Sequence, residues 1–177
     1  MLTTRVQYQK GVLAIERIIS DEVEKAALDQ AILDYEPVFL QRAFGYEFFR
    51  DLMAYVNDAN HVANPIYDNL LNGVEFTGSC GNLQKTEPLK YCTSRYVFFE
   101  YKNETLTKNT TSGEMVFKTE NADAVAPANR LVQVWNELAV AMVKIYDYIQ
   151  INRVDYPTIY NYGGDESLIK KINHYGI

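Results

Sequence analysis

The stretch that decides the fold is Ala128–Ile151, ANRLVQVWNELAVAMVKIYDYIQI. Its apolar residues recur every three or four positions, at Leu131, Val134, Trp135, Leu138, Met142, Ile145 and Ile149. This spacing places them on one face of an α-helix, and Pro127 directly before them suits a first helical turn. Because further apolar residues widen the stripe, we predict a long helix that is central to a mainly α-helical bundle.

The N-terminal half carries further helix signals. Asp21 can cap a helix, and Glu24 three residues later completes a capping box. Pro37 lacks an amide proton, so we predict that it ends this helix near Tyr35 and opens a second short helix over residues 38–44. Gly45 is placed to close that second helix.

Two more helices are expected before the middle of the chain. An apolar stripe over residues 46–57 predicts the first of them. Asn64-Pro65 is a cap followed by a first-turn proline, and Gly73 lies just past the end of the two-turn helix that they open.

A tyrosine-rich helix is predicted from about Thr86 to Lys102. Leu89, Cys92 and Tyr96 share one of its faces, which places Cys92 among packed side chains.

Two segments do not fit the helical pattern and are predicted to be arms or β-hairpins. Residues 74–77 alternate apolar and polar, and glycines follow them. Residues 103–123 are rich in Thr and Ser, and a loop of that length is uncommon in a compact domain unless it binds something. We therefore take these residues as candidate interface positions: Val74, Phe76, Thr111, Met115 and Phe117.

The chain after residue 155 is an aromatic tail. Tyr156-Pro157 ends the long helix, and residues 165–174 are expected to form one last short helix. Such a tail either packs on its own domain or docks on a neighbour, so Tyr156, Tyr160 and Tyr162 join the candidate interface set. The 177 residues are thus predicted to form one domain, with a core at about 20–155 and a tail at 156–177.

Composition excludes several classes of protein. Seventeen Lys and Arg against 23 Asp and Glu give a net charge of −6, which disfavours general binding to nucleic acid. No stretch approaches the length of apolar sequence that spans a membrane, so we expect a soluble protein without membrane contact. Cys80 and Cys92 form no metal-binding pair and are expected to be free thiols.

No pattern of residues points to catalysis. The sequence lacks the glycine-rich phosphate loops, the HExxH zinc motif and the GxSxG nucleophile turn. The carboxylates of residues 21–29 gather where a helix N-terminus favours anions. His61 and His174 have no Ser or Cys at an informative spacing. We therefore predict no catalytic, cofactor-binding or metal-binding residues, and no enzyme.

The order of elements resembles the small head–tail connector (adaptor) proteins of tailed phages, in particular those of Bacteroidetes-infecting and crAss-like phages. The resemblance spans about residues 20–160 and rests on six stretches of sequence. They are YEPVFL at 35–40, FGYEFFRDL at 44–52, IYDNLLNG at 66–73, the tyrosine-rich helix at 91–101, TTSGEMV at 110–116 and YDYI at 146–149. Phe44 stands where the family has leucine, and nothing after Tyr160 matches.

The resemblance implies a structural protein of the virion, assembled in the host cytoplasm. It would form a ring of about twelve copies between the portal protein and the tail or a second adaptor, lining or surrounding the DNA channel, close to packaged DNA but without specific contact. The alternative is a small helical regulatory or ligand-binding protein without catalytic activity.

Overall fold

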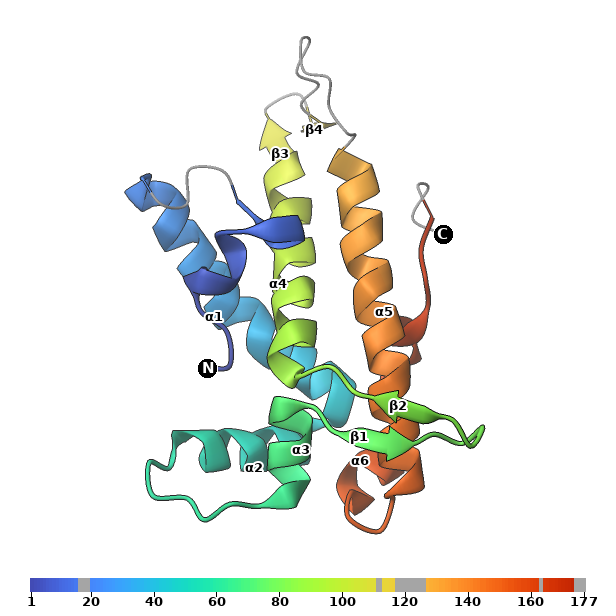
Figure 1. The fold of residues 1–177 in the computed structure, drawn as a ribbon. Coiled ribbons are helices and arrows are strands. Elements are labelled where there is room, and N and C mark those ends of the chain that lie inside the picture. Colours follow the sequence, from blue (N-terminus) through green and yellow to red (C-terminus); the bar gives the residue numbers. More distant parts are fainter. Residues whose placement is uncertain (16–19, 111–112, 117–126, 163, 174–177) are drawn as a thin grey trace.

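Three helices lie side by side and form the body of the molecule (Figure 1). They are α1 (Glu22–Phe44), α4 (Leu89–Leu106) and α5 (Pro127–Ile151), and α4 lies between the other two and packs on both. The structure is a computed structural model that describes residues 1–15, 20–110, 113–116, 127–162 and 164–173. The described chain is mainly helical with short two-stranded antiparallel hairpins, in agreement with the fold class that the sequence predicts.

Helix α1 begins as predicted but does not break at Pro37. The Asp21 side chain accepts hydrogen bonds from the backbone amides of Val23 and Glu24, which is the expected cap. The helix then continues through Pro37 to Phe44, so the predicted division into two helices is wrong. Proline removes only the bond to the carbonyl of the half-exposed Leu33, where water can replace the missing donor.

Tertiary contacts hold α1 together around the proline. The buried carboxylate of Glu36 accepts hydrogen bonds from the amides of Leu2 and Thr3, at 2.7 and 2.9 Å, and from the Thr3 hydroxyl at 2.8 Å. Phe39 and Leu40 in the next turn are fully buried. The burial of this turn offsets the missing hydrogen bond.

Helices α2 (Tyr46–Asn57) and α3 (Pro65–Asn72) lie at one end of the body and have the predicted bounds. Asn64 caps α3 by accepting from the amide of Ile66, and Pro65 takes the first turn. Gly73 ends α3 with a φ of +78°, and a β-carbon there would lie 2.6 Å from the Thr86 carbonyl oxygen. Only glycine fits this position, because both its conformation and its surroundings exclude a side chain.

The segment after Gly73 forms a hairpin that is held on the body. Strand β1 (Glu75–Thr77) pairs antiparallel with β2 (Leu83–Lys85), and Phe76 lies opposite Gln84. The Asp147 carboxylate of α5 accepts a hydrogen bond from the amide of Ser79 in the turn. The hairpin alternative of the prediction is therefore confirmed for this segment.

Helix α4, and not α5, lies in the middle of the body. Its buried side chains include the polar residues Thr93 and Ser94, whose hydroxyls donate to the carbonyls of Leu89 and Tyr91 in their own helix. Because α4 is covered by α1 on one side and α5 on the other, it needs no strongly polar face. Apolar and polar residues of α4 are therefore not sharply separated into two faces in its sequence. The predicted helix over 128–151 exists as α5, but its predicted central place is not confirmed.

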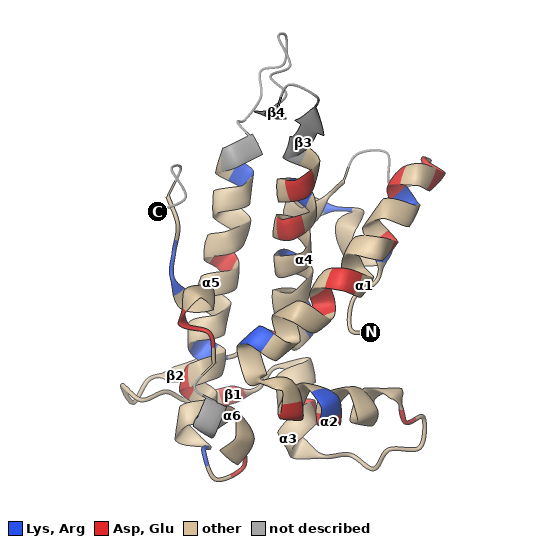
Figure 2. Ribbon diagram, turned by 180° about the vertical axis from the view of Figure 1, so that it is seen from behind, with Lys and Arg blue, Asp and Glu red and all other residues tan. Residues whose placement is uncertain are grey.

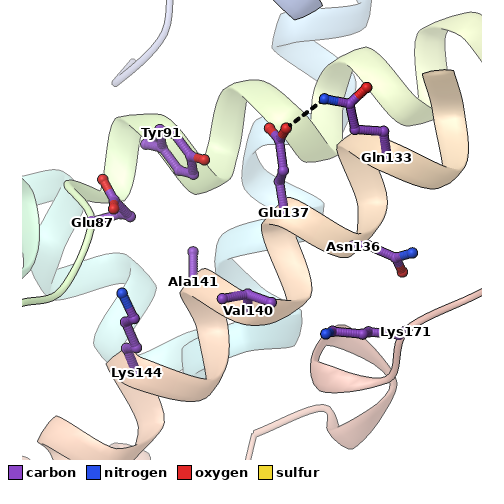
Figure 3. Close-up of a pocket in the computed structure, with 9 residues that line it drawn as sticks. All are labelled: Glu87, Tyr91, Gln133, Asn136, Glu137, Val140, Ala141, Lys144 and Lys171. Atoms are coloured by element: carbon purple, nitrogen blue, oxygen red, sulfur yellow. Dashed lines mark hydrogen bonds between the residues drawn. The ribbon is translucent and has the colours of Figure 1, made fainter. Parts of the chain in front are cut away.

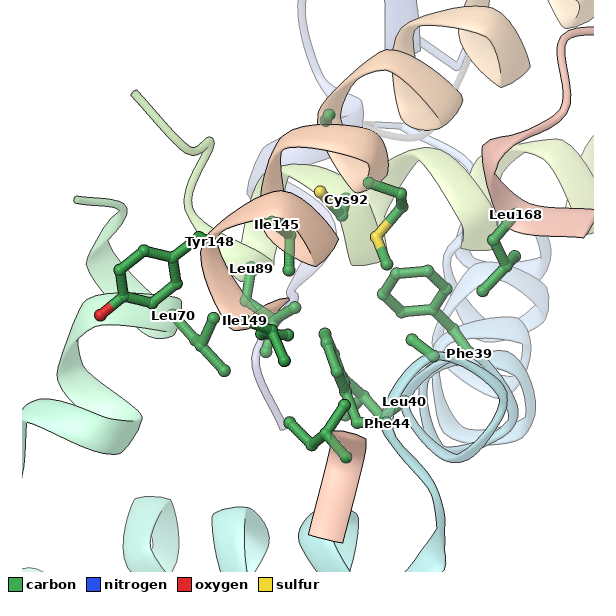
Figure 4. Close-up of a cluster of buried hydrophobic side chains, with 14 of the residues drawn as sticks. Phe39, Leu40, Phe44, Leu70, Leu89, Cys92, Ile145, Tyr148, Ile149 and Leu168 are labelled. Atoms are coloured by element: carbon green, nitrogen blue, oxygen red, sulfur yellow. The ribbon is translucent and has the colours of Figure 1, made fainter. Parts of the chain in front are cut away.

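The core consists of two clusters of apolar side chains. The larger joins α1, α2, α4 and α5 with the C-terminal elements, and Figure 4 shows Phe39, Leu89 and Ile145 converging within it. The smaller joins α1, α4 and the first turns of α5 with the N-terminal turns η1 (Arg5–Tyr8) and η2 (Gly11–Leu13). Buried residues such as Tyr8 and Leu168 lie outside 20–155, so the core extends beyond the predicted range at both ends.

The C-terminal elements are α6 (Pro157–Tyr162) and η3 (Glu166–Ile169). Within the described residues, the helix predicted over 165–174 is only the short 3-10 turn η3. Asp165 caps this turn by accepting from the amide of Ser167.

Candidate assembly surface

A groove runs along the outer side of α5, and we call it the α5 groove (Figure 3). Its volume is about 450 Å³. It is lined by the start of α4, one face of α5 and the C-terminal segment, through Glu87, Tyr91, Gln133, Asn136, Glu137, Val140, Ala141, Lys144 and Lys171. Its lining thus combines two lysines, two glutamates, two side-chain amides and one tyrosine with the aliphatic side chains of Val140 and Ala141.

An ion pair and a stacked ring fix the wall of the α5 groove. The Arg95 guanidinium lies 3.3 Å from the centroid of the Tyr91 ring and donates to a single oxygen of Glu137, at 2.9 Å from Nε and 2.7 Å from Nη2. Gln133 donates to the other Glu137 oxygen at 2.9 Å. Burial raises the pKa of Tyr91, while the nearby Arg95 opposes that shift. Both oxygens of Glu137 therefore accept hydrogen bonds from within the chain.

The carboxylates at the start of α1, which the sequence analysis attributes to the helix N-terminus, have partners within the chain. Asp21 caps the helix, Glu22 pairs with Lys25, Glu24 accepts from the Tyr101 hydroxyl, and Asp29 binds Arg5. Across the part of the chain that the structure describes, no three His, Cys, Asp or Glu side chains gather as a metal site would require.

His61 and Cys92 pack against other residues of the chain, whereas Cys80 is exposed. The His61 ring packs against the Tyr55 ring at a tilt of 49°, with ring centroids 4.2 Å apart, and its Nδ1 lies 2.7 Å from the Asp58 carbonyl oxygen. Burial raises the pKa of the Cys92 thiol to about 12, whereas Cys80 is exposed in the turn of the β1–β2 hairpin. Cys92 is thus a packing residue, as its helical position predicts. His174 lies outside the described residues.

Two predicted interface residues are directed into the chain's own interior, which corrects the prediction for these two. Phe76 and Tyr156 are buried, and each packs against the Tyr148 ring, at centroid distances of 5.4 and 5.8 Å. Val74 is partly buried against the same cluster. An aromatic side chain that already fills the core of its own chain is not available to a neighbouring subunit. The alternating pattern of residues 74–77 therefore marks a strand whose inner side packs on the core, and not a free arm.

The other predicted interface residues stay predictions. Met115 lies on β4 (Gly113–Val116) opposite Lys108 of β3 (Thr107–Thr110), and Tyr160 and Tyr162 lie on α6. Thr111 and Phe117 lie outside the described residues.

The C-terminal tail, as far as the structure describes it, packs on its own chain. Trp135 donates from Nε1 to the Lys170 carbonyl at 2.9 Å, and the Asn136 amide group bonds both the N–H and the carbonyl of Ile172. Of the two alternatives for the tail, packing on its own domain is therefore the one observed for these residues.

A charged cluster fastens the tail to α1. The Arg42 guanidinium donates to the Asp165 carboxylate at 2.8 Å, to the Tyr96 hydroxyl at 2.7 Å and to the Ser167 hydroxyl at 3.0 Å. Burial alone raises the pKa of Asp165, but the hydrogen bonds from Ser167 and Arg42 outweigh it and hold that pKa below its ordinary value.

The hairpin β3–β4 extends beyond the helical body. It follows directly on α4, its two strands pair with each other from Thr107↔Val116 to Thr110↔Gly113, and β3 also contacts α4. Figure 1 shows it at the far end of α4 and α5, on the opposite side from α2, α3 and α6. The predicted loop or hairpin arm over 103–123 is therefore a two-stranded hairpin at 107–110 and 113–116. Residues 103–106 instead continue α4, and residues 111–112 and 117–123 lie outside the described part of the chain.

Sequence reasoning missed the α5 groove. No short motif marks it, because its residues come from three separate parts of the chain; the only local signal is Gln133 and Glu137 at the i, i+4 spacing of a helix-face pair. No known protein family, curated protein or solved structure matches this chain. Among the described helices, none combines the length and the apolar character that crossing a bilayer requires.

Proposed function

We propose that this chain is a non-enzymatic structural protein of a tailed-phage particle, an adaptor that joins the head to the tail. The single observation that carries the proposal is the β3–β4 hairpin, which extends past the ends of α4 and α5 instead of lying on the body. An isolated two-stranded hairpin is only marginally stable in water. A hairpin in this position gains stability when it docks on another protein, by adding strands or filling a groove there.

The rest of the chain supports a scaffold role. The charged groups that could serve in catalysis, Glu137 and the carboxylates at the start of α1, have partners within the chain. The resemblance of residues 20–160 to head–tail connector proteins agrees with a helical body that carries an extended arm.

In the particle, about twelve copies form a ring between the portal protein and the tail or a second adaptor. The arm of each copy reaches one of these partners. Packaged DNA passes nearby without being bound, because the net charge of −6 gives the chain no general attraction to phosphates.

Electron microscopy of purified particles of the phage that encodes the chain tests this proposal. The expected result is density for the chain in a ring at the collar, and detection of its peptides in the particle by mass spectrometry. Particles that lack the chain would overturn the proposal.

Limited proteolysis gives a second readout for the arm. Trypsin should cut the purified chain first after Lys108 in β3, because the hairpin opens more easily than the helices. Lys144, which lies within α5, is the matched internal control and should be cut only when the body unfolds. The same Lys108 site should be protected in the particle; equal cleavage in both states would contradict docking of the arm.

A further inference from the structure

A second groove adjoins the α5 groove at the start of α4. It lies between the N-terminal turn η2 and α4, and its volume is about 510 Å³. Glu87 and Tyr91 line both hollows, so the two meet at these residues, and we call the pair the joined groove. Two hollows that share a wall suit an extended occupant that crosses from one to the other.

Positive charge gathers around the joined groove. Lys10 and Lys90 line its η2 part. Lys144 and Lys171 line its α5 part, and Figure 3 shows both side chains directed toward the groove, one from α5 and one from the C-terminal segment. Within the described part of the chain, none of these four ammonium groups takes part in an ion pair or a hydrogen bond. The joined groove therefore holds unpaired cations in a chain whose net charge is −6.

Two carboxylates also line the joined groove, and their surroundings differ. Glu137 accepts hydrogen bonds from Arg95 and Gln133, so its charge is offset within the chain. Glu87 forms no ion pair with any residue that the structure describes, and it lies where the two hollows meet. The joined groove is thus positive in both of its parts and negative between them.

Most acidic side chains lie on a different side of the molecule. Figure 2 shows Asp and Glu along α1 and near the end of α4 that leads into the β3–β4 hairpin. Helix α4 separates α1 from α5 (Figure 1). Because salt screens exposed charges beyond about 8 Å at physiological ionic strength, these carboxylates contribute little to the field over the joined groove.

The lining favours an acidic segment of a protein over a nucleic acid. Aliphatic side chains such as Val12 and Val140 can cover apolar residues of a peptide. A single-stranded nucleic acid instead requires open aromatic faces on which its bases stack. Among the described lining residues Tyr91 is the only aromatic one, and the Arg95 guanidinium covers one face of its ring, 3.3 Å from the centroid. Glu87 also repels an unbroken row of phosphates.

We propose that the joined groove binds an extended acidic segment of a partner protein. Its carboxylates lie over the two pairs of lysines, and an uncharged stretch lies over Glu87. Complementary charge orients the segment, and Glu87 rejects a segment that is acidic throughout. The inference goes beyond the proposed function, because it concerns a surface apart from the β3–β4 hairpin and holds whether or not the chain belongs to a phage particle.

Fluorescence anisotropy of labelled synthetic peptides, titrated with the full chain, tests the proposal. The first peptide carries a pair of glutamates at each end of a central stretch of alanine, leucine and glutamine. In the second peptide glutamine replaces every glutamate, and in the third glutamate also fills the centre. A labelled oligothymidylate is the nucleic-acid probe. Circular dichroism checks that all variants keep the helical fold.

The wild type should bind the first peptide at about 0.1 mM protein, above the micromolar dissociation constants of weak specific interfaces. The second peptide should bind at least about tenfold more weakly. Lys90→Gln and Lys144→Gln should each weaken binding about two- to fivefold, the effect of one exposed ion pair, and the double variant by the product of the two. Glu87→Gln should improve binding of the third peptide more than that of the first.

Lys25→Gln is the matched control. It removes the same charge from α1, where Lys25 pairs with Glu22 and lines neither part of the joined groove, so peptide binding should not change. A loss equal to that of Lys90→Gln would mean attraction by overall charge and would overturn the proposal.

Two further results overturn the proposal: no binding of the first peptide at that concentration, and tighter binding of the oligothymidylate, which would assign the groove to nucleic acid. The proposed function fails separately. Peptide binding by a chain that occurs in no particle would keep the groove and remove the adaptor, whereas a chain found in the collar that binds no acidic peptide would do the reverse.

Discussion

Replacing Tyr156 by alanine distinguishes a core residue from an interface residue. Tyr156 is buried, packs on the Tyr148 ring, and donates a hydrogen bond of 2.9 Å to the carbonyl of Ile66 in α3. A buried aromatic side chain removes about 150–250 Å² from water, which at about 25 cal/mol per Å² corresponds to roughly 4–6 kcal/mol. Since alanine still buries part of that area, we expect Tyr156→Ala to lower the free energy of unfolding by about 3–5 kcal/mol.

Urea denaturation of the isolated chain measures this loss, with linear extrapolation to water. Tyr156→Phe keeps the ring and removes only the hydrogen bond to Ile66, so its cost should be about 1 kcal/mol. Tyr46, which is 64% exposed, serves as the control, and Tyr46→Ala should change stability by less than about 0.5 kcal/mol. If the urea midpoint of Tyr156→Ala equals that of the wild type, the Tyr156 side chain does not stabilise the core of its own chain, and the burial argument is refuted.

Three further outcomes are expected. The ionised Asp165 carboxylate should contribute its full stability above about pH 4, and this contribution should be lost as the pH falls through the lowered pKa of Asp165. In acid titrations followed by circular dichroism, Asp165→Asn should therefore lose less stability than the wild type over that pH range. An acid titration of Asp165→Asn that matches the wild type would contradict the pairing with Arg42. Gly73→Ala should lower the thermal unfolding midpoint more than Gly81→Ala. Both glycines have a φ near +80°, but only at Gly73 would a β-carbon approach a carbonyl oxygen, that of Thr86. Equal shifts of the midpoint would mean that this close approach does not limit the residue at position 73. Cys80 should react with a thiol reagent at neutral pH, whereas Cys92 should react only after unfolding. Rapid labelling of both cysteines in the folded protein would contradict the burial and the raised pKa of Cys92.

Helix ends were predictable from the sequence because their causes are local. Asp21 and Asn64 cap helices through amides two or three residues away, and Gly73 ends α3 through its own φ. Pro37 has an equally local preference, but the burial of Glu36, Phe39 and Leu40 overrides it. Local preference decides a boundary only where packing does not oppose it.

Only part of the candidate assembly surface could be predicted from the sequence. The Thr- and Ser-rich composition of residues 103–123 indicated a loop or hairpin arm, and the described residues of this segment hold the β3–β4 hairpin, although residues 103–106 continue α4. The α5 groove could not be predicted, because Glu87, Glu137 and Lys171 are brought together by the fold and no spacing relates them.

By itself, then, the sequence determined the helical class and most helix ends, which depend on periodicity and on hydrogen bonds between near neighbours. The tertiary structure alone decided that α4 and not α5 takes the middle position, and that Phe76 and Tyr156 point inward. The physical reason is that alternation and aromatic content report only that a side chain will be covered. Whether its own chain or another subunit covers it depends on how distant segments pack.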